Sequence, residues 1–217
     1  LIGKFNPHAK DISSLRIVQT AFKIICFIGG IHTTVIGYEN IPKDKPVLFI
    51  GNHRGFFDTI ISYSMMPGIT GFVAKKEIEK VPLLRVWMRY LHCLFLDRAN
   101  IKEGLKTILK GIDEVKAGVS MVIFPEGTRN KGDGIMPFKE GSFKIAEKSG
   151  CLIIPMVQNN TSAAFEDHFP FIRRTHTIIE FGTPIDLTTL SKEDRKAIGA
   201  YTHSIMLKMY EKNQSLV

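Results

Sequence analysis

The sequence is poor in cysteine, and the cysteines it has do not form a disulfide framework. Three occur in 217 residues, at Cys26, Cys93 and Cys151, an odd number with wide spacing. This usage is typical of small core side chains in a reducing compartment. The seven histidines show no HExxH-like spacing and no CxxC pair is present, so we predict no structural metal. A chain of this length can bury a hydrophobic core without disulfides or a structural metal ion.

Long hydrophobic runs, repeats and low-complexity tracts are also missing. The composition, 44% hydrophobic and 23% charged, is that of an ordinary globular protein. The most apolar stretch, residues 15–28, is about 21 Å long as a helix. A helix that spans the hydrocarbon core of a bilayer needs about twenty residues. We therefore expect this stretch not to cross a membrane.

Acidic residues are fewer than basic ones. Lys plus Arg number 29 and Asp plus Glu 21, which gives a net charge of +8 and a pI near 9.4. A basic balance favours polyanionic partners: nucleic acid, anionic lipid headgroups or phosphorylated substrates.

Residues 15–28 predict a helix that is apolar around most of its circumference. Its polar residues share one narrow face: Arg16, Gln19, Thr20 and Lys23. Ser13 or Ser14 could cap its start, and the glycines at 29 and 30 end it. Such a helix either packs on the body of the protein or lies half sunk in a membrane surface with its basic residues at headgroup level. We expect residues 1–32 to form a membrane-associating segment and residues 33–217 a second domain.

The rest of the chain alternates short apolar runs with amphipathic segments. Strands are expected over 33–38, 46–51, 69–74, 93–96, 119–124, 152–157 and 175–181, and helices over 59–66, 81–92, 100–117, 141–148 and from 191 onward. This alternation predicts an α/β fold with a mostly parallel central sheet flanked by helices. In such folds functional residues gather where strands end.

The strand at 46–51 ends in Gly51 and is followed by Asn-His-Arg-Gly-Phe-Phe-Asp, which contains His53 and Asp58. Five residues apart on a regular helix, these two side chains would point about 140° away from each other. They can meet if the segment turns, which Gly55 would permit. The carboxylate would then fix the imidazole tautomer and make His53 a general base. The alternative is a surface histidine, with Asp58 capping a helix that begins at Thr59.

The strand at 119–124 is followed by Pro-Glu-Gly-Thr-Arg. Arg129 offers a two-point guanidinium fork for a phosphate, beside a glycine that lets backbone N–H groups approach closely. Glu126 by itself reads as a solvated loop residue or a helix cap. Alone, this second motif is a weak signal.

Together the two motifs resemble those of the bacterial 1-acyl-glycerol-3-phosphate acyltransferase family, within the glycerophospholipid acyltransferases. NHRGFFD matches the NHxxxxD block of that family, and FPEGTR matches a second block in full. Further similarity lies at 72–77 with Pro82, at 96–98 and at 151–156, and the resemblance spans about 37–187.

The resemblance implies a role for each matching residue. His53 would take the proton from the acceptor hydroxyl and Asp58 would orient it. The residues that would bind the glycerol phosphate of the acceptor are Lys75, Glu126, Gly127, Thr128 and Arg129. The acceptor would be lysophosphatidic acid, the donor acyl-CoA or acyl-carrier protein, and the product phosphatidic acid. This chemistry requires neither metal nor cofactor. A lipid substrate would also place the enzyme at an anionic membrane surface, on the cytoplasmic face of the cell membrane.

Three alternatives remain at this point. The acceptor could be glycerol 3-phosphate or a lyso-aminolipid. An acyl-cysteine intermediate could form on Cys93 or Cys151, although neither lies in a catalytic block of the family. The chain could instead be a basic nucleic-acid-binding module, which would interleave aromatic and basic residues on one face. Its fifteen phenylalanines lie mainly in apolar runs, so we expect no nucleic-acid partner.

Overall fold

The computed structural model describes residues 6–217, in which one sheet of seven strands has the order β1-β7-β6-β2-β5-β3-β4. The strands are β1 (Ile31–Ile36), β2 (Leu48–Gly51), β3 (Thr70–Lys75), β4 (Leu94–Leu96), β5 (Ser120–Ile123), β6 (Ile153–Asn159) and β7 (Thr175–Phe181). The helices are α2 (Pro7–Ile28), α3 (Phe56–Ser64), α4 (Pro82–Tyr90), α5 (Ile101–Lys116), α6 (Lys144–Ser149), α7 (Lys192–Lys196) and α8 (Ile198–Gln214).

All neighbouring strands pair in parallel except β6 and β7, which are antiparallel. The mostly parallel sheet expected from the alternating pattern is therefore confirmed. Because β2, β3, β5 and β6 run in the same direction, their carboxyl ends lie at one edge of the sheet. The segments that follow these four strands can meet there.

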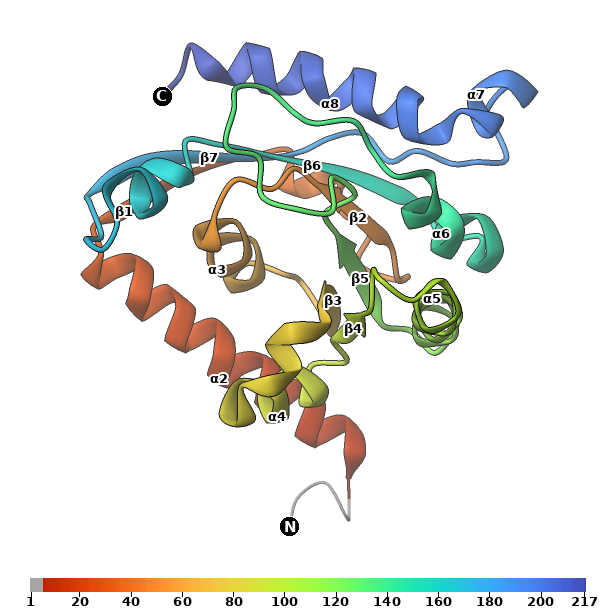
Figure 1. The fold of residues 1–217 in the computed structure, drawn as a ribbon, viewed down its shortest axis with the longest axis horizontal. Coiled ribbons are helices and arrows are strands. Elements are labelled where there is room, and N and C mark those ends of the chain that lie inside the picture. The colour runs from red at the N-terminus through yellow and green to blue at the C-terminus, as the bar shows by residue number, and fades with distance from the viewer. Residues whose placement is uncertain (1–5) are drawn as a thin grey trace.

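Helices cover both faces of the sheet (Figure 1). In β2, Leu48 and Ile50 belong to a core shared with α5, α6 and α8, whereas Phe49 belongs to a core shared with α2, α3 and α4. Side chains alternate between the two faces of a strand, and a parallel sheet is apolar on both. The continuous apolar run that begins β2 thus fits a central strand between two helical layers.

Helix α2 begins earlier than the sequence indicated. Its N-cap is Asn6, whose side chain accepts a hydrogen bond from the backbone N–H of Ala9 (2.9 Å), and Pro7 occupies the first helical position. An asparagine cap followed by proline is a strong helix start. The expected caps are therefore wrong: Ser14 is buried within the helix, and Ser13 donates to the carbonyl of Ala9.

Of the four polar residues in the stripe of α2, one is buried and three are exposed. Gln19 is buried and donates to the carbonyls of Tyr63 (3.3 Å) and Met66 (2.8 Å) at the end of α3. Helix ends leave carbonyls without intrahelical partners, and the Gln19 amide satisfies two groups in this region. The packing interpretation thus holds for the side of α2 that carries Gln19. Membrane contact by the opposite, apolar face stays a prediction.

The boundary expected between residues 32 and 33 falls inside β1, which pairs along its length with β7. Helix α2 packs against α3 and α4. Residues 1–5 of the expected membrane-associating segment lie outside the described residues. Across 6–217, none of the helices has both the length and the apolar character needed to span a bilayer.

Candidate active site

His53 and Asp58 meet at the carboxyl end of β2. The Nδ1 atom of His53 lies 2.7 Å from Oδ2 of Asp58, and that carboxylate is fully buried. Helix α3 begins at Phe56, so Asp58 sits in its first turn. The same Oδ2 accepts hydrogen bonds from the backbone N–H groups of Arg54 (2.5 Å) and Gly55 (2.7 Å). Asp58 therefore both caps the helix and orients the histidine.

Gly55 makes room for a contact and does not provide the turn that was expected of it. Its backbone is extended, with φ at −159°, a conformation open to any residue. A Cβ atom at this position would instead lie 2.3 Å from Oε2 of Glu166. The glycine thus admits a carboxylate from a distant part of the chain.

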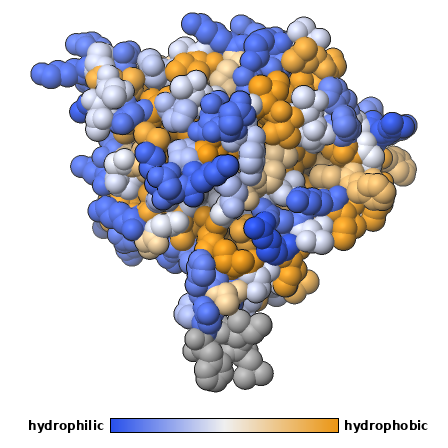
Figure 2. All heavy atoms as spheres, turned by 180° about the vertical axis from the view of Figure 1, so that it is seen from behind, coloured by the Kyte–Doolittle hydropathy of each residue, from blue (hydrophilic) through white to orange (hydrophobic). Residues whose placement is uncertain are grey.

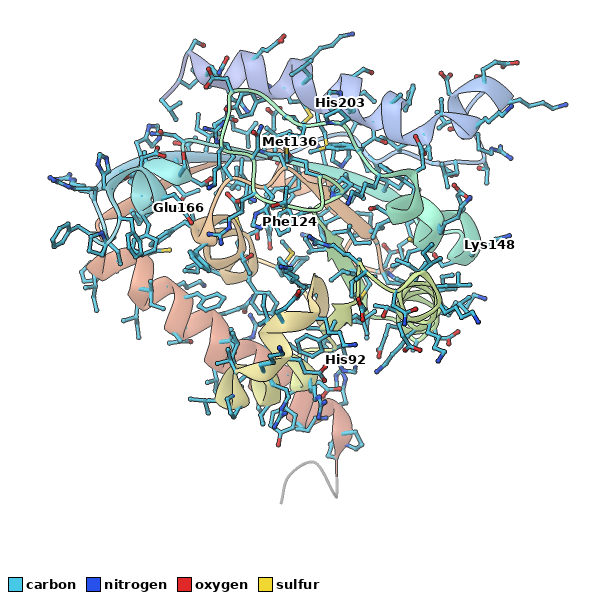
Figure 3. All side chains as sticks on the ribbon, in the orientation of Figure 1. His92, Phe124, Met136, Lys148, Glu166 and His203 are labelled. Carbon is cyan, nitrogen blue, oxygen red and sulfur yellow. The ribbon has the colours of Figure 1, made fainter. Side chains whose placement is uncertain are left out.

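The imidazole of His53 stacks on the ring of Phe124, the residue labelled in Figure 3, with 4.4 Å between centroids and 12° between planes. Gly51 leaves room for this ring, since a Cβ there would lie 2.7 Å from Cε1 of Phe124. Within residues 6–217, the Nε2 atom of His53 has no hydrogen-bond partner. With Nδ1 held by Asp58, Nε2 is the nitrogen available to accept a proton.

Glu126 is buried and contacts the backbone of this histidine. Its Oε1 accepts from the backbone N–H of His53 (2.6 Å), and its Oε2 accepts from that of Met136 (3.1 Å). Burial raises the pKa of the Glu126 carboxyl, although both hydrogen bonds act in the opposite direction. Through these two hydrogen bonds, Glu126 holds the backbone of His53 in place beside that of Met136. Direct contact with the acceptor, as the resemblance implies, stays a prediction.

Gly127 allows a tight turn and a close approach. Its φ of +78° is left-handed, and a Cβ here would lie 2.8 Å from Nζ of Lys139. The backbone N–H of Lys139 donates to the carbonyl of Pro125 (3.0 Å), which holds the lysine beside this loop. Sequence reasoning missed Lys139, which adds a cation next to the predicted phosphate-binding residues.

Arg129 and Lys75 reach the same edge of the sheet from β5 and its neighbour β3. The guanidinium of Arg129 lies over the ring of Phe56, 4.3 Å from its centroid. The amine of Lys75, at the end of β3, is exposed and lies 3.4 Å from Oε1 of Glu77. Thr128 is exposed. The adjacent parallel strands β2, β5 and β3 thus lead, at this edge, to His53, Arg129 and Lys75, respectively.

Two further site residues come from the connection between β6 and β7. Thr161 donates from Oγ1 to Oδ1 of Asp58, and Glu166 lies beside Arg129. Sequence reasoning identified neither residue as part of the site. The available signal was their position directly after a strand whose carboxyl end lies at this same edge.

The cysteines are poorly suited to a covalent intermediate. Cys93 is buried, and burial raises the pKa of its thiol to about 12 even though its sulfur accepts from the N–H of Phe72. Burial also raises the pKa of Cys151. The nucleophile is the thiolate, which is scarce at both positions near neutral pH.

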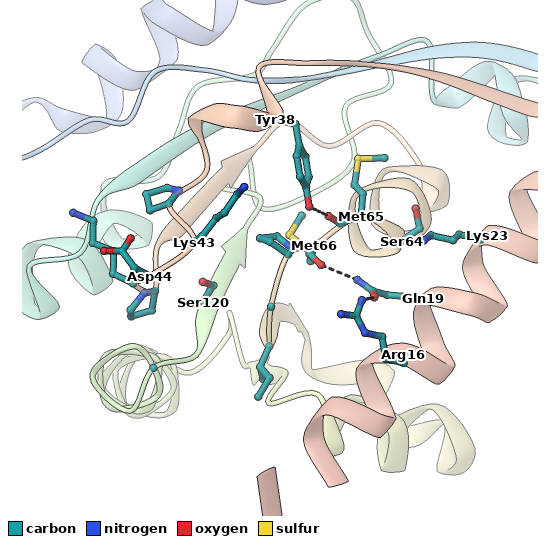
Figure 4. A pocket seen from close by; sticks show the side chains of 17 residues that line it. Arg16, Gln19, Lys23, Tyr38, Lys43, Asp44, Ser64, Met65, Met66 and Ser120 are labelled. Atoms are coloured by element: carbon teal, nitrogen blue, oxygen red, sulfur yellow. Dashed lines mark hydrogen bonds between the residues drawn. The ribbon is translucent and has the colours of Figure 1, made fainter. Parts of the chain in front are cut away.

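A separate cavity of about 780 Å³ lies at the opposite edge of the sheet, between α2 and the amino ends of β2 and β5 (Figure 4). Its lining includes the basic side chains of Arg16, Lys23, Lys43 and Lys45, with the acid Asp44. His53 does not line this cavity. The predicted chemistry therefore belongs to the carboxyl edge.

Comparison with known proteins gives consistent matches. A family model described as Acyltransferase matches residues 32–159. The 1-acyl-sn-glycerol-3-phosphate acyltransferase of Saccharomyces cerevisiae is 31% identical over 214 residues, covering 97% of this chain and 68% of that protein. The protein of the same name from Haemophilus influenzae is 32% identical over 176 residues, covering 78% and 72%.

The fold also matches a solved structure, the 1-acyl-sn-glycerophosphate (LPA) acyltransferase PlsC from Thermotoga maritima. The TM-score is 0.81 at 24% sequence identity, covering 92% of this chain and 79% of that one. The family model spans more than half of the chain and includes His53, Asp58 and Arg129. With this match, and with relatives above 30% identity along most of its length, the chain belongs to the acyltransferase family that includes the 1-acyl-sn-glycerol-3-phosphate acyltransferases.

Proposed function

We propose that this enzyme transfers a fatty acyl group from a thioester, acyl-CoA or acyl-carrier protein, to the free hydroxyl of 1-acyl-sn-glycerol 3-phosphate, forming phosphatidic acid. The observation that carries the proposal is the His53–Asp58 pair, 2.7 Å apart, with Nε2 left open. The relatives, which are named 1-acyl-sn-glycerol-3-phosphate acyltransferases, support this acceptor. Arg129 at the same edge supplies a charge that suits its phosphate.

The reaction follows from the placement of His53. As the acceptor oxygen attacks the thioester carbonyl carbon, Nε2 takes the hydroxyl proton, because an alcohol is a poor nucleophile near neutral pH. The new C–O bond forms, the C–S bond breaks, and the proton passes to the departing thiolate. The carboxylate of Asp58 keeps the proton of Nδ1 in place and stabilises the imidazolium that forms.

A panel of acceptors and donors tests this function. Purified enzyme is incubated with lysophosphatidic acid, glycerol 3-phosphate or a lyso-aminolipid, each with acyl-CoA and with acyl-carrier protein. Products are identified by mass spectrometry. We expect phosphatidic acid as the main product. A higher kcat/KM with either other acceptor would contradict the proposed substrate.

The acceptor phosphate is proposed to bind Arg129 and Lys75. Removing either cation should mainly raise the acceptor KM. Arg129→Lys should also raise it, because an ammonium cannot reproduce the two-point guanidinium fork. Lys144→Ala, which removes a lysine paired with Glu147 on α6, is the matched control. An acceptor KM within twofold of wild type for folded Arg129→Ala would refute the assignment.

An anionic membrane surface is the proposed location, on the cytoplasmic face. The outer side of α2 exposes large apolar side chains, among them Phe27 (85% exposed) and Ile28 (78%). In the β6–β7 connection, Phe169 and Phe171 are exposed as well. The two segments adjoin, since a Cβ at Gly29 would lie 3.0 Å from Cγ2 of Ile172.

Together these segments define an apolar edge, formed by Ile24, Ile25, Phe27, Ile28, Phe169, Phe171 and Ile172. Figure 2 shows hydrophobic side chains gathered at the right-hand side of the molecule, where the end of α2 lies. Arg173 and Arg174 are exposed beside it. Apolar area next to basic residues is the pattern of proteins that bind anionic bilayers.

Paired serine substitutions test this location. Phe27→Ser with Ile28→Ser, or Phe169→Ser with Phe171→Ser, should weaken co-sedimentation with anionic vesicles. Ile101→Ser with Leu105→Ser removes similarly exposed apolar side chains from α5 and serves as the control. Equal binding by wild type and both apolar-edge variants would contradict the proposal.

A further inference from the structure

Glu166 touches both sequence motifs although it belongs to neither. It lies in the 3-10 turn Glu166–His168, within the β6–β7 connection, and Figure 3 places it beside α3. Its Oε1 accepts a hydrogen bond from the backbone N–H of Phe56 (2.7 Å). The same oxygen lies 3.2 Å from Nη1 of Arg129. One carboxylate therefore links the first residue of α3 to the predicted phosphate-binding arginine.

Each of the three residues Glu166, Arg129 and Phe56 contacts the other two. The guanidinium of Arg129 lies over the ring of Phe56, with 4.3 Å to its centroid, while Glu166 contacts both Nη1 of the guanidinium and the backbone N–H of Phe56. Gly55 makes this possible, because any side chain there would collide with Glu166. The position of Arg129 is thus fixed relative to the helix turn that carries Asp58.

The geometry leaves most of the guanidinium free. An arginine has five N–H donors in a rigid fork, and Glu166 engages Nη1 alone. The distance of 3.2 Å is longer than the 2.7–2.9 Å typical of charge-assisted hydrogen bonds. The Glu166 contact therefore orients the side chain without occupying the fork that a phosphate would use.

Arg129 needs such a contact because its side chain is long and 42% exposed. An unrestrained arginine loses substantial rotamer entropy when it binds. We propose that Glu166 is a positioning residue that holds the Arg129 guanidinium on Phe56, ready for the acceptor phosphate. This inference rests on the proposed function, in which Arg129 binds that phosphate.

Glu166→Gln tests it with little change in shape. The amide oxygen can still accept from the N–H of Phe56, whereas the charge that attracts Arg129 is lost. We expect the acceptor KM to rise about threefold to fivefold, a modest effect because the ion pair is partly exposed. The value of kcat with saturating acceptor should stay within twofold of wild type. An unchanged or lower KM would overturn the inference, since a lower value would mean that Glu166 competes with the phosphate.

Asp167→Asn is the matched control from the same turn. Its Oδ2 accepts from Oγ of Ser162 (3.0 Å), so this variant loosens the connection without touching Arg129. We expect its acceptor KM to stay within the error of wild type. An equal rise in KM for Asp167→Asn and Glu166→Gln would show that the connection acts through its general structure, and would overturn the inference.

A double-mutant cycle separates this inference from the proposed function. In an Arg129→Ala background, Glu166→Gln should change KM by less than its effect in wild type, because the partner is gone. A full additional effect would overturn the inference. If Arg129→Ala itself leaves KM unchanged, the phosphate assignment fails. If Arg129→Ala raises KM and Glu166→Gln does not, only the role of Glu166 fails.

Discussion

Thr161 donates a hydrogen bond from Oγ1 to Oδ1 of Asp58, the carboxylate oxygen that does not contact His53. The other oxygen, Oδ2, receives the imidazole and two backbone N–H groups. Both oxygens of this buried carboxylate are thus satisfied, as a buried charge requires. Thr161 fixes the rotation of the carboxylate and, through it, the orientation of His53.

Replacing Thr161 by valine keeps the shape and removes this donor. A lost hydrogen bond to a charged, buried group costs about 1.5–3 kcal/mol, so we expect a lower free energy of unfolding. We also expect kcat to fall by about tenfold or more while the acceptor KM changes little. Steady-state kinetics and urea unfolding measure both. Thr161→Ser, which retains the hydroxyl, should recover most of kcat. Failure of serine to do so would argue against the role of the hydrogen bond.

Glu126 predicts a pH dependence of stability. Its pKa is raised in the folded protein, mainly by burial, so the folded state holds this proton more tightly than the unfolded chain does. The free energy of unfolding therefore loses a contribution as pH rises from the ordinary value of 4.5 through the raised pKa. Glu126→Gln removes this titration.

Urea unfolding of wild type and Glu126→Gln between pH 4 and 7 checks this. The difference in stability, wild type minus variant, should fall as pH increases across that interval. A constant difference would contradict the assignment. The variant should also lower kcat, because one amide oxygen cannot accept from the N–H groups of both His53 and Met136.

The sheet was predictable because its signals are local. Short apolar runs indicate the strands, and the parallel arrangement of β2 and β5 places His53 and Arg129 at the same edge of the sheet. The burial of Gln19 on α2 could not be predicted, because it depends on carbonyls near the end of α3, which no local pattern identifies as partners. Thr161 and Glu166 could not be predicted as site residues for the same reason. Their contacts with Asp58 and Phe56 join residues more than a hundred positions apart.

The cysteines should be dispensable for turnover. The pKa of Cys93 is raised to about 12 and that of Cys151 is also raised, in both cases by burial. Cys93→Ala and Cys151→Ala should therefore retain kcat within about threefold, because thiolate chemistry requires deprotonation. Cys93→Ala should lose some stability, since it vacates a buried site. Loss of turnover in a folded Cys151→Ala variant would support an acyl-cysteine intermediate instead.

The central claim is that His53, held by Asp58, is the general base of acyl transfer. The most direct test is kcat for His53→Ala, measured with lysophosphatidic acid and acyl-CoA and compared with Asp58→Asn and the double variant. General bases contribute about 10²–10⁴-fold. We predict a loss of that size for His53→Ala with an acceptor KM near wild type, and little further loss in the double variant. A folded His53→Ala enzyme that keeps more than a tenth of the wild-type kcat would contradict the account.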